Sequence, residues 1–516
     1  MTDNASNNKR IAKNSLFLSL RMVVVMVISL YTTRVVLQVL GIVDYGVNNV
    51  VCGFVAMFQF LNTSMGNGIQ RFYNYEYGKN GDEGANKVFC TAIYIQALAS
   101  FVIAVLVELF GLWYMHNKMV IPIERMVAAE WIFQFAVIKF VLGIMQSPFY
   151  AAIIAHERLD VYAIIQVFDS LLNLGIVVLL NYLDGDKLVL FGLLGLIISI
   201  ANFAIYVIYS RRKFVEIRFR RGFEKNLFKK MLGFSGWNLF GSFSGVMENQ
   251  GINLVLNLFF GPVVNAAKGI ANQINGAVQA FVLNITTPVR PQVTQSYARG
   301  DYKRTMSLTY GISKMSSAII MMFAIPACTE IDYLLHLWLG EAIPDHTKLF
   351  TILVLLTSLV NNLNAAISNV VHATGIMRDY QLLGSIVRLC SVPLAFVLIK
   401  FYDMPELALG AVLICAVFTH LVSLIISKRI FGLHLREYTI NVVFPIVLVF
   451  CVSLIIVCSS HCFLTEGILR VIVSSVFSII SVCSLFFYVA FNDGERQLTF
   501  QMVRPLLAKF KNKCIK

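Results

Sequence analysis

Charged residues are scarce in this chain of 516 residues. Lys, Arg, Asp and Glu make up 14% of it, against about 25% in an ordinary soluble domain. Apolar and aromatic residues reach 58%, and the mean hydropathy is +0.74. The 70 charges (42 basic, 28 acidic) cannot cover the surfaces of the several soluble domains that this length would otherwise form, and so apolar a chain does not stay disordered. The sequence predicts an integral membrane protein.

The sequence also lacks the motifs of common enzyme and metal sites. GxSxG, HExxH and P-loop patterns are absent, and the ten cysteines form neither a CxxC pair nor a zinc-type spacing with histidine. The predicted connecting loops are short, whereas a membrane glycan polymerase is expected to carry a sizeable outer loop for its chemistry. These absences favour a transporter over an enzyme and predict no cofactor.

The net charge of +14 does not indicate a nucleic-acid partner, because the basic residues lie in short segments between apolar runs. If the N-terminus is cytoplasmic, 30 of the 42 basic residues fall in predicted inner segments and about eight in outer ones. The segment 211–230 alone holds nine. This asymmetry follows the positive-inside rule and predicts that both termini are cytoplasmic.

Long apolar runs recur along the chain, each close to the roughly 20 helical residues that cross a bilayer core. They lack the strict alternation of barrel strands, so we expect an all-α membrane protein with about 14 transmembrane helices. The expected spans are 15–39, 45–65, 88–114, 124–145, 161–182, 188–210, 231–259, 264–288, 306–327, 347–370, 379–400, 407–427, 441–459 and 467–490.

An internal repeat relates the two halves of the chain. LGIVDYG, around Gly41, precedes YGKNGD at Tyr77, and LFFGPVV, with Gly261, precedes YARGD at Tyr297 with the same spacing. An offset of six spans keeps the orientation, which is typical of parallel transporter repeats. We therefore expect two pseudo-symmetric six-helix lobes and two extra helices. The expected parts are an N-lobe at 1–210, a basic cytoplasmic linker at 211–230, a C-lobe at 231–430, and spans 13 and 14 with a basic cytoplasmic tail at 431–516.

Polar residues recur at helical spacing on several spans. On span eight, Asn272, Asn275 and Gln279 share one face. Such stripes either hold helices together or line a hydrated cavity between the lobes. Four stripes, one in the N-lobe and three in the C-lobe, favour the cavity, whose amides and hydroxyls would suit hydrogen bonding to sugars. The other stripes are Tyr162, Gln166, Asp169 and Asn173; Asn238, Ser242, Gly245, Asn249 and Asn253; and Thr357, Asn361, Asn364, Ser368 and His372.

Cations within spans are the sharpest functional signal. Four lie at a common depth in the inner half, namely Arg21, Lys139, Lys314 and Arg388. Each costs at least about 2.5–3.5 kcal/mol on insertion, although long side chains also reach the interface by snorkelling. We interpret them as a site for an anionic headgroup open to the cytoplasm, where arginine would bind phosphate through two hydrogen bonds. Arg34 and Lys268 lie in the outer half and could receive the anion later.

Two acidic residues lie near the middle of the predicted membrane. Asp169 is on span five and Glu248 on span seven. They either pair with neighbouring cations or serve as carboxylates that couple transport to H⁺ or Na⁺.

The pattern resembles the polysaccharide and O-antigen repeat-unit flippases of the multidrug/oligosaccharidyl-lipid/polysaccharide (MOP) exporter superfamily. The resemblance rests on the helix plan and on RFYNYEYGKNGD (71–82) and TTPVRPQVTQSYARGD (286–301). It implies flipping of an undecaprenyl-pyrophosphate-linked oligosaccharide across a bacterial inner membrane for O-antigen, capsule or exopolysaccharide assembly. Arg21 matches this branch, which tends to place cations on span one, whereas the drug-exporting branch tends to carry a carboxylate there.

The resemblance also implies the partners: the lipid-linked oligosaccharide, membrane lipid, and glycan polymerase and assembly proteins as candidates. We expect a monomer. The alternatives are a multidrug/cation antiporter of the same fold, for which an acidic cavity would be expected, a peptidoglycan-precursor flippase, and, from another class, a membrane glycan polymerase.

Overall fold

The computed structural model describes residues 2–491 and 496, apart from 157, 219–223, 287–288, 290–292, 294–295, 298, 375, 377 and 460–463. For residues 2–21, 23, 232–238 and a few others within helices, only the backbone is described. The part described is mainly helical and contains no strand, which confirms the expected all-α fold. The helices are α1 (Thr2–Ala56), α2 (Gln59–Asn117), α3 (Met126–Ala155), α4 (Leu159–Leu179), α5 (Lys187–Lys213), α6 (Lys225–Phe260), α7 (Pro262–Thr286), α9 (Tyr302–Thr329), α10 (Ile331–Leu339), α11 (Thr347–Thr374), α12 (Arg378–Leu389), α13 (Ser391–Tyr402), α14 (Glu406–Phe431), α15 (Leu435–Tyr438), α16 (Phe444–Ser459) and α17 (Ile468–Leu485), with the short turns η1 (Ile123–Arg125), η3 (Thr439–Val443) and η5 (Phe486–Ala490).

Eleven helices in the described part of the chain are long and apolar enough to cross a membrane. The first of them, Val24–Ala56, contains the backbone break at Gly41, and α2 contains a second break at Gly81. The helices α6 and α7, which cover the expected spans 231–259 and 264–288, are not among the eleven. The expected number of about fourteen spans stays a prediction.

The backbone breaks recur at corresponding positions of the two sequence repeats. Gly41 has φ 79° and ψ 170°, and Gly261, between α6 and α7, has φ 76° and ψ −169°. The second pair, Gly81 and Gly300, has φ values of 60° and 75°. Residues with a Cβ rarely adopt such conformations, so each repeat places glycine where its helices must change direction.

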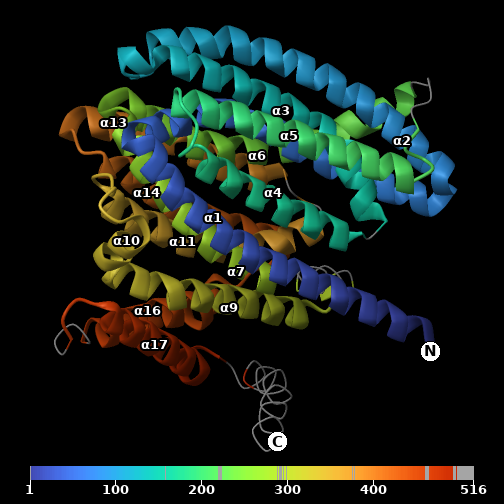
Figure 1. The fold of residues 1–516 in the computed structure, drawn as a ribbon. Helices are drawn as coiled ribbons and strands as arrows, with labels where there is room; N and C mark the ends of the chain where they lie inside the picture. The colour runs from blue at the N-terminus through green and yellow to red at the C-terminus, as the bar shows by residue number, and fades with distance from the viewer. Residues whose placement is uncertain are drawn as a thin grey trace, which may run out of the picture. The chain divides into compact units, whose positions relative to one another are not determined.

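The chain divides into two compact units, unit 1 and unit 2. Unit 1 comprises 1–273, 338–350 and 385–412, and in it α3 packs against α2 and α5 while α1 packs against α4 (Figure 1). Its main apolar core contains Val50, Phe133 and Ile144, which are almost fully buried. Because lipid tails are as apolar as these side chains, close packing rather than water exclusion holds such helices together.

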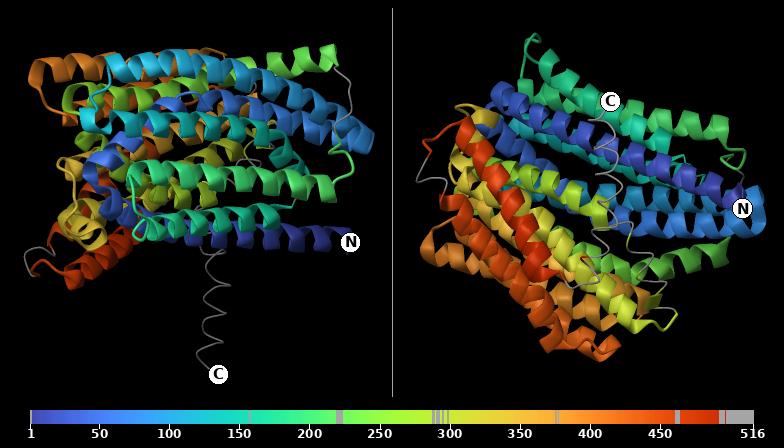
Figure 2. Two further views of the ribbon diagram at one scale, coloured as in Figure 1. Left: turned by 45° about the horizontal axis from the view of Figure 1, so that its top comes forward. Right: turned by 90° about the horizontal axis from the view of Figure 1, so that it is seen from below.

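Unit 2 comprises 274–337, 351–384 and 413–516. In it α16 and α17 lie side by side and both pack against α9 (Figure 2). A buried ion pair links α9 to α17: Arg470 Nε donates to Glu330 Oε2 at 2.9 Å, and the Ser474 hydroxyl donates to Glu330 Oε1 at 2.9 Å. The carboxylate of Glu330 thus has a partner for each oxygen, as a buried charge requires.

The described start of the basic linker is anchored to unit 1. Glu216 is 3% exposed, and its Oε1 accepts a hydrogen bond from the Tyr73 hydroxyl at 2.7 Å and lies 2.6 Å from His156 Nε2. The Asn86 amide donates to the carbonyl oxygens of Glu216 and Arg218. These contacts join the segment after α5 to α2 and α3.

At the opposite end of these helices, Arg125 joins three elements of unit 1. Its Nε donates to Asp44 Oδ1 at 2.7 Å and its Nη1 to Asp186 Oδ2 at 2.8 Å. Asp186 also caps α5 by accepting from the amides of Leu188 and Val189, a favourable place for a carboxylate. Partial burial raises the pKa of Asp186, but the hydrogen bonds from Arg125 and these amides outweigh it and leave the pKa below its ordinary value.

Candidate functional site

Three charged residues from separate stretches of sequence form a cluster in unit 1, which we term the charge cluster: Glu248 on α6, Lys268 on α7 and Arg388 on α12. Lys268 is 3% exposed, and its Nζ donates to the carbonyl oxygen of Asn249. Glu248 interacts electrostatically with both Arg388 and Lys268. The carboxylate predicted as a coupling group is therefore close to two cations predicted to bind the substrate.

The α6–α7 hairpin places Glu248 and Lys268 together. Gly261 turns the chain, and the Asn265 side chain of α7 donates at 2.7 Å to both the carbonyl and side-chain oxygens of Asn253 on α6. Arg388 approaches from α12, where its Nη1 would lie 3.9 Å from a Cβ placed on Gly245. Gly245 precedes Glu248 by nearly one helical turn, so it leaves space for the guanidinium beside α6.

The charge cluster carries a net charge of +1 when all three groups are ionised. Among the described residues, Glu248 forms no direct ion pair with either cation, and Lys268 has one hydrogen bond for its three donors. Arg388 could offer two parallel N–H donors to a phosphate or carboxylate. Chemically, the arrangement can hold an anion, with Glu248 competing against that anion for the same cations.

A second charged cluster lies among α3, α4 and α5 of unit 1. Lys139 Nζ would lie 2.5 Å from a Cβ on Gly195, and Lys139 interacts electrostatically with Asp169 and Cys52. Asp169 Oδ1 accepts a hydrogen bond from the Asn202 amide, and its carbonyl accepts one from Asn173 at 2.8 Å. Asp169 is thus tied to its own helix and to α5, with Lys139 as its nearby cation.

The remaining predicted site residues have different environments. Arg21 lies in α1, but its side chain is outside the described residues. Arg34 is half-buried and has interaction partners. Lys314, on α9 of unit 2, is fully buried and also has interaction partners.

Some residues of the polar stripes form hydrogen bonds that hold helices together, whereas others form no short hydrogen bond or line a cavity. Asn275 accepts from the Ser358 hydroxyl at 2.5 Å, which joins α7 to α11. Asn364 is buried and bonded to Tyr380. By contrast, Asn272 makes only a long contact of 3.5 Å to Asn249, and Gln279 lines a cavity in unit 2. One stripe can therefore serve both purposes that the sequence left open.

Sequence reasoning missed several polar contacts. Asn202 was not singled out, although an isolated asparagine in an otherwise apolar span is a signal for a buried partner. Asn257 exchanges two hydrogen bonds with the backbone of Val120, and its helical register on α6 gave no indication of that partner. In the part of the chain that the structure describes, no three His, Cys, Asp or Glu residues are placed to hold a metal ion.

No protein-family model and no curated protein matches this sequence. Solved structures do match. The lipid II flippase MurJ in an inward closed conformation is 14% identical, with a TM-score of 0.72, over 95% of this chain and 100% of that one. An inward-facing multidrug resistance MATE family transporter of the MOP superfamily is 13% identical, with a TM-score of 0.59, over 80% and 94% of the two chains.

A third match is a MOP superfamily transporter from Pyrococcus furiosus, which is 13% identical with a TM-score of 0.57 over 81% of this chain and 95% of that one. Identities this low establish the fold alone. The chain is thus a multi-pass membrane protein with the fold of the lipid II flippase MurJ and of MOP superfamily transporters.

Proposed function

We propose that this protein is a flippase for undecaprenyl-pyrophosphate-linked oligosaccharide repeat units, which it moves from the cytoplasmic to the periplasmic leaflet of a bacterial inner membrane. The observation that carries the proposal is the charge cluster, in which two cations and one carboxylate lie together within predicted spans. Two cations suit a pyrophosphate, whereas a site for a cationic drug would carry an excess of acidic groups. The fold shared with a lipid II flippase and with exporters agrees with transport of this kind.

In this proposal Arg388 binds the pyrophosphate from the cytoplasmic side together with Arg21. Lys268 binds the anion beside Arg388 in the charge cluster. Lys139 and Lys314 contribute further positive charge, and Arg34 receives the anion in the outer half. The two repeats act as lobes that rock about the site, with 211–230 as their cytoplasmic linker. Such a motion exposes the site to each leaflet in turn.

Glu248 supplies the coupling step. When it is ionised, it competes with the anion for Lys268 and Arg388, and when it is protonated or neutralised by Na⁺, both cations are free to bind. A carboxylate that exchanges an ion in this way links anion binding to the ion gradient. Asp169, beside Lys139, is the second candidate for this role.

Two other functions fit the same fold. A lipid II flippase would bind a peptidoglycan precursor through the same kind of cationic site. The MurJ structure matches nearly the whole of this chain. A multidrug/cation antiporter is favoured by the MATE structures and disfavoured by the charge cluster. Transport of a radiolabelled organic cation by purified protein in proteoliposomes, with no requirement for Arg388, would favour the antiporter.

The decisive experiment replaces Arg388 and measures surface polysaccharide in the native host. Arg388→Ala removes charge-assisted hydrogen bonds worth about 1.5–3 kcal/mol, so export should fall about 10- to 100-fold at an unchanged protein level in the membrane. Arg388→Lys should restore part of the export, because the ammonium group of lysine is a point charge and lacks the planar guanidinium that forms two parallel hydrogen bonds. Arg378→Ala, an exposed position on the same helix, is the matched control. Normal export in Arg388→Ala cells would contradict the proposed site.

A further inference from the structure

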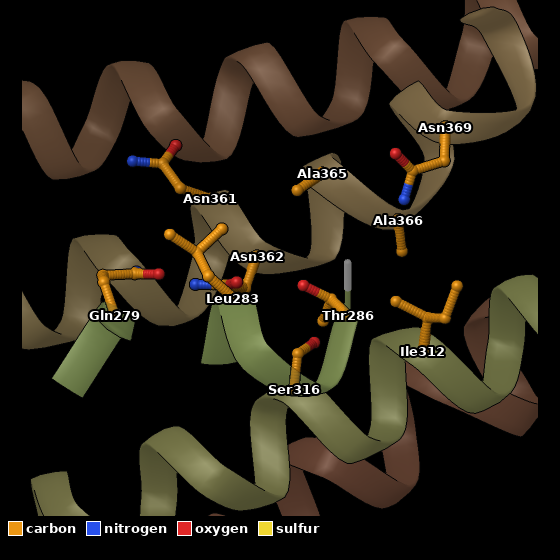
Figure 3. Close-up of a pocket in the computed structure, with 10 residues that line it drawn as sticks. All are labelled: Gln279, Leu283, Thr286, Ile312, Ser316, Asn361, Asn362, Ala365, Ala366 and Asn369. Carbon is orange, nitrogen blue, oxygen red and sulfur yellow. The ribbon is translucent and has the colours of Figure 1, made fainter. Parts of the chain in front are cut away.

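A cavity of about 190 Å³ lies within unit 2, among α7, α9 and α11 (Figure 3). Its walls are made mainly of amides, hydroxyls and small or aliphatic side chains, and none of the lining residues is charged. They are Gln279, Leu283, Thr286, Ile312, Ser316, Asn361, Asn362, Ala365, Ala366 and Asn369. Most are uncharged polar groups that a neutral, hydrogen-bonding ligand would need.

The amides of the cavity differ in whether their hydrogen bonds are already used. The Asn362 amide donates to the Ser358 carbonyl at 2.9 Å, and the Ser316 hydroxyl donates to the Ser313 carbonyl at 3.1 Å. In the described part of the chain, Gln279, Asn361 and Asn369 have no hydrogen-bond partner, although they are partly buried. These three amides of the lining therefore keep their donors and acceptors for water or a ligand.

Helix packing alone does not account for these three amides. Where an amide of this unit serves packing, it has a partner, as in the contact between Asn275 and Ser358 at 2.5 Å. These three amides are half-exposed, and an unpaired amide against apolar groups would cost about 1–3 kcal/mol, so amides left open inside a membrane protein point to a wet cavity or a ligand. Each amide offers both N–H donors and a carbonyl acceptor. That set matches hydroxyl and acetamido groups, which also donate and accept.

The size and the absence of charge narrow the ligand class. The cavity is smaller than the roughly 300–1,000 Å³ of drug-sized pockets, and an anion or cation would lack a counter-charge on its walls. Leu283, Ile312 and the two alanines give an apolar side on which the C–H face of a sugar ring can rest. We propose that this cavity binds one monosaccharide unit of the glycan carried by the lipid substrate. This inference rests on the proposed function and assigns sugar recognition to unit 2, apart from the charge cluster.

The test measures access to the cavity and its protection by sugars. Ala365→Cys introduces a thiol on the wall and keeps every amide, and Asp379→Cys, an exposed position at the start of α12 outside the lining, is its control. Both are made in the full chain without its native cysteines, purified in nanodiscs and treated with a hydrophilic thiol reagent. The probes are a panel of monosaccharides, including glucose, galactose, rhamnose, N-acetylglucosamine and glucuronic acid, and inorganic pyrophosphate.

We expect at least one sugar to slow labelling of Ala365→Cys about threefold at roughly twice its Kd, with no effect on Asp379→Cys and none from pyrophosphate. Adding Asn361→Leu and Asn369→Leu should abolish the protection. The inference is overturned if the Ala365→Cys thiol does not react, if no sugar protects it, or if the protection survives loss of both amides. Protection by sugars alongside normal export in Arg388→Ala cells would uphold this cavity while rejecting the pyrophosphate site, so the two proposals can fail separately.

Discussion

Glu248 shows how one residue can decide what a polar membrane site binds. The cluster contains two cations for a single carboxylate, and Lys268 reaches the Asn249 carbonyl while interacting electrostatically with Glu248. Its chemistry therefore depends on the charge of Glu248. When Glu248 is ionised, its charge offsets part of the positive charge of Lys268 and Arg388. When it is neutral, it leaves two positive groups in a partly dehydrated setting where their attraction for an anion is strong.

Replacing Glu248 tests this competition directly. Glu248→Gln keeps the shape and removes the charge, so inorganic pyrophosphate should bind the purified protein about tenfold more tightly, equivalent to ~1.4 kcal/mol. In the native protein, binding should weaken as pH rises, because deprotonation of Glu248 restores the competing charge. Pyrophosphate binding to Glu248→Gln should not show the part of this weakening that comes from deprotonation of Glu248. Isothermal titration calorimetry across pH measures both effects.

The control for this titration is Glu437→Gln, an exposed glutamate in unit 2. It should retain native affinity and the native pH profile, which separates the local effect from a general change in net charge. Native-like pyrophosphate binding in Glu248→Gln at every pH would show that Glu248 does not compete for the cations.

At the scale of the helices, α1 packs closely against the α6–α7 hairpin within unit 1. A Cβ on Gly46 would lie 1.9 Å from the carbonyl oxygen of Pro262, and one on Gly269 would lie 2.8 Å from the Asn49 amide nitrogen. Asn253 adds a hydrogen bond to the Asn49 carbonyl at 3.2 Å. Small residues allow membrane helices to approach this closely and to gain packing energy. The segment after Gly41 thus depends on glycine both for its turn and for its contact with α7.

A methyl group at Gly46 should force these helices apart. We expect Gly46→Ala to destabilise the protein by about 1–3 kcal/mol through overpacking, seen as a lower Tm in detergent. Gly276→Ala on α7 is the matched control, because a Cβ there meets nothing within 4 Å. It should raise stability by about 0.4–1 kcal/mol through the lower entropy of the unfolded chain. Equal Tm values for the two variants would contradict the close contact.

For the molecule as a whole, orientation in the membrane is set by charge. The segment 211–230 holds nine Lys and Arg residues, and their cost of translocation predicts a cytoplasmic location. In a cysteine-free background, Arg212→Cys should resist an impermeant thiol reagent in intact cells and react after the membrane is opened. Asp184→Cys, in the exposed turn between α4 and α5, should react in both conditions. Labelling of Arg212→Cys from outside would reverse the topology.

The sequence by itself determined the all-α membrane fold and the repeat that relates Gly41 to Gly261. Helix-length apolar runs and glycine at positive φ are local properties, so Gly41 and Gly261 could be paired from their surroundings alone. Hydropathy likewise identified Glu248, Lys268 and Arg388 as charges that require a partner in a span.

Only the tertiary structure decided which partners these polar groups have. Glu248 and Arg388 are 140 residues apart, and helical periodicity fixes the face of a side chain but not the helix that faces it. For the same reason, Asn275 and Gln279 share one stripe on α7, yet one is bonded to Ser358 and the other lines an open cavity. Whether an amide in a membrane helix packs or binds depends on the neighbouring helix, and that neighbour is set by the packing of the whole unit.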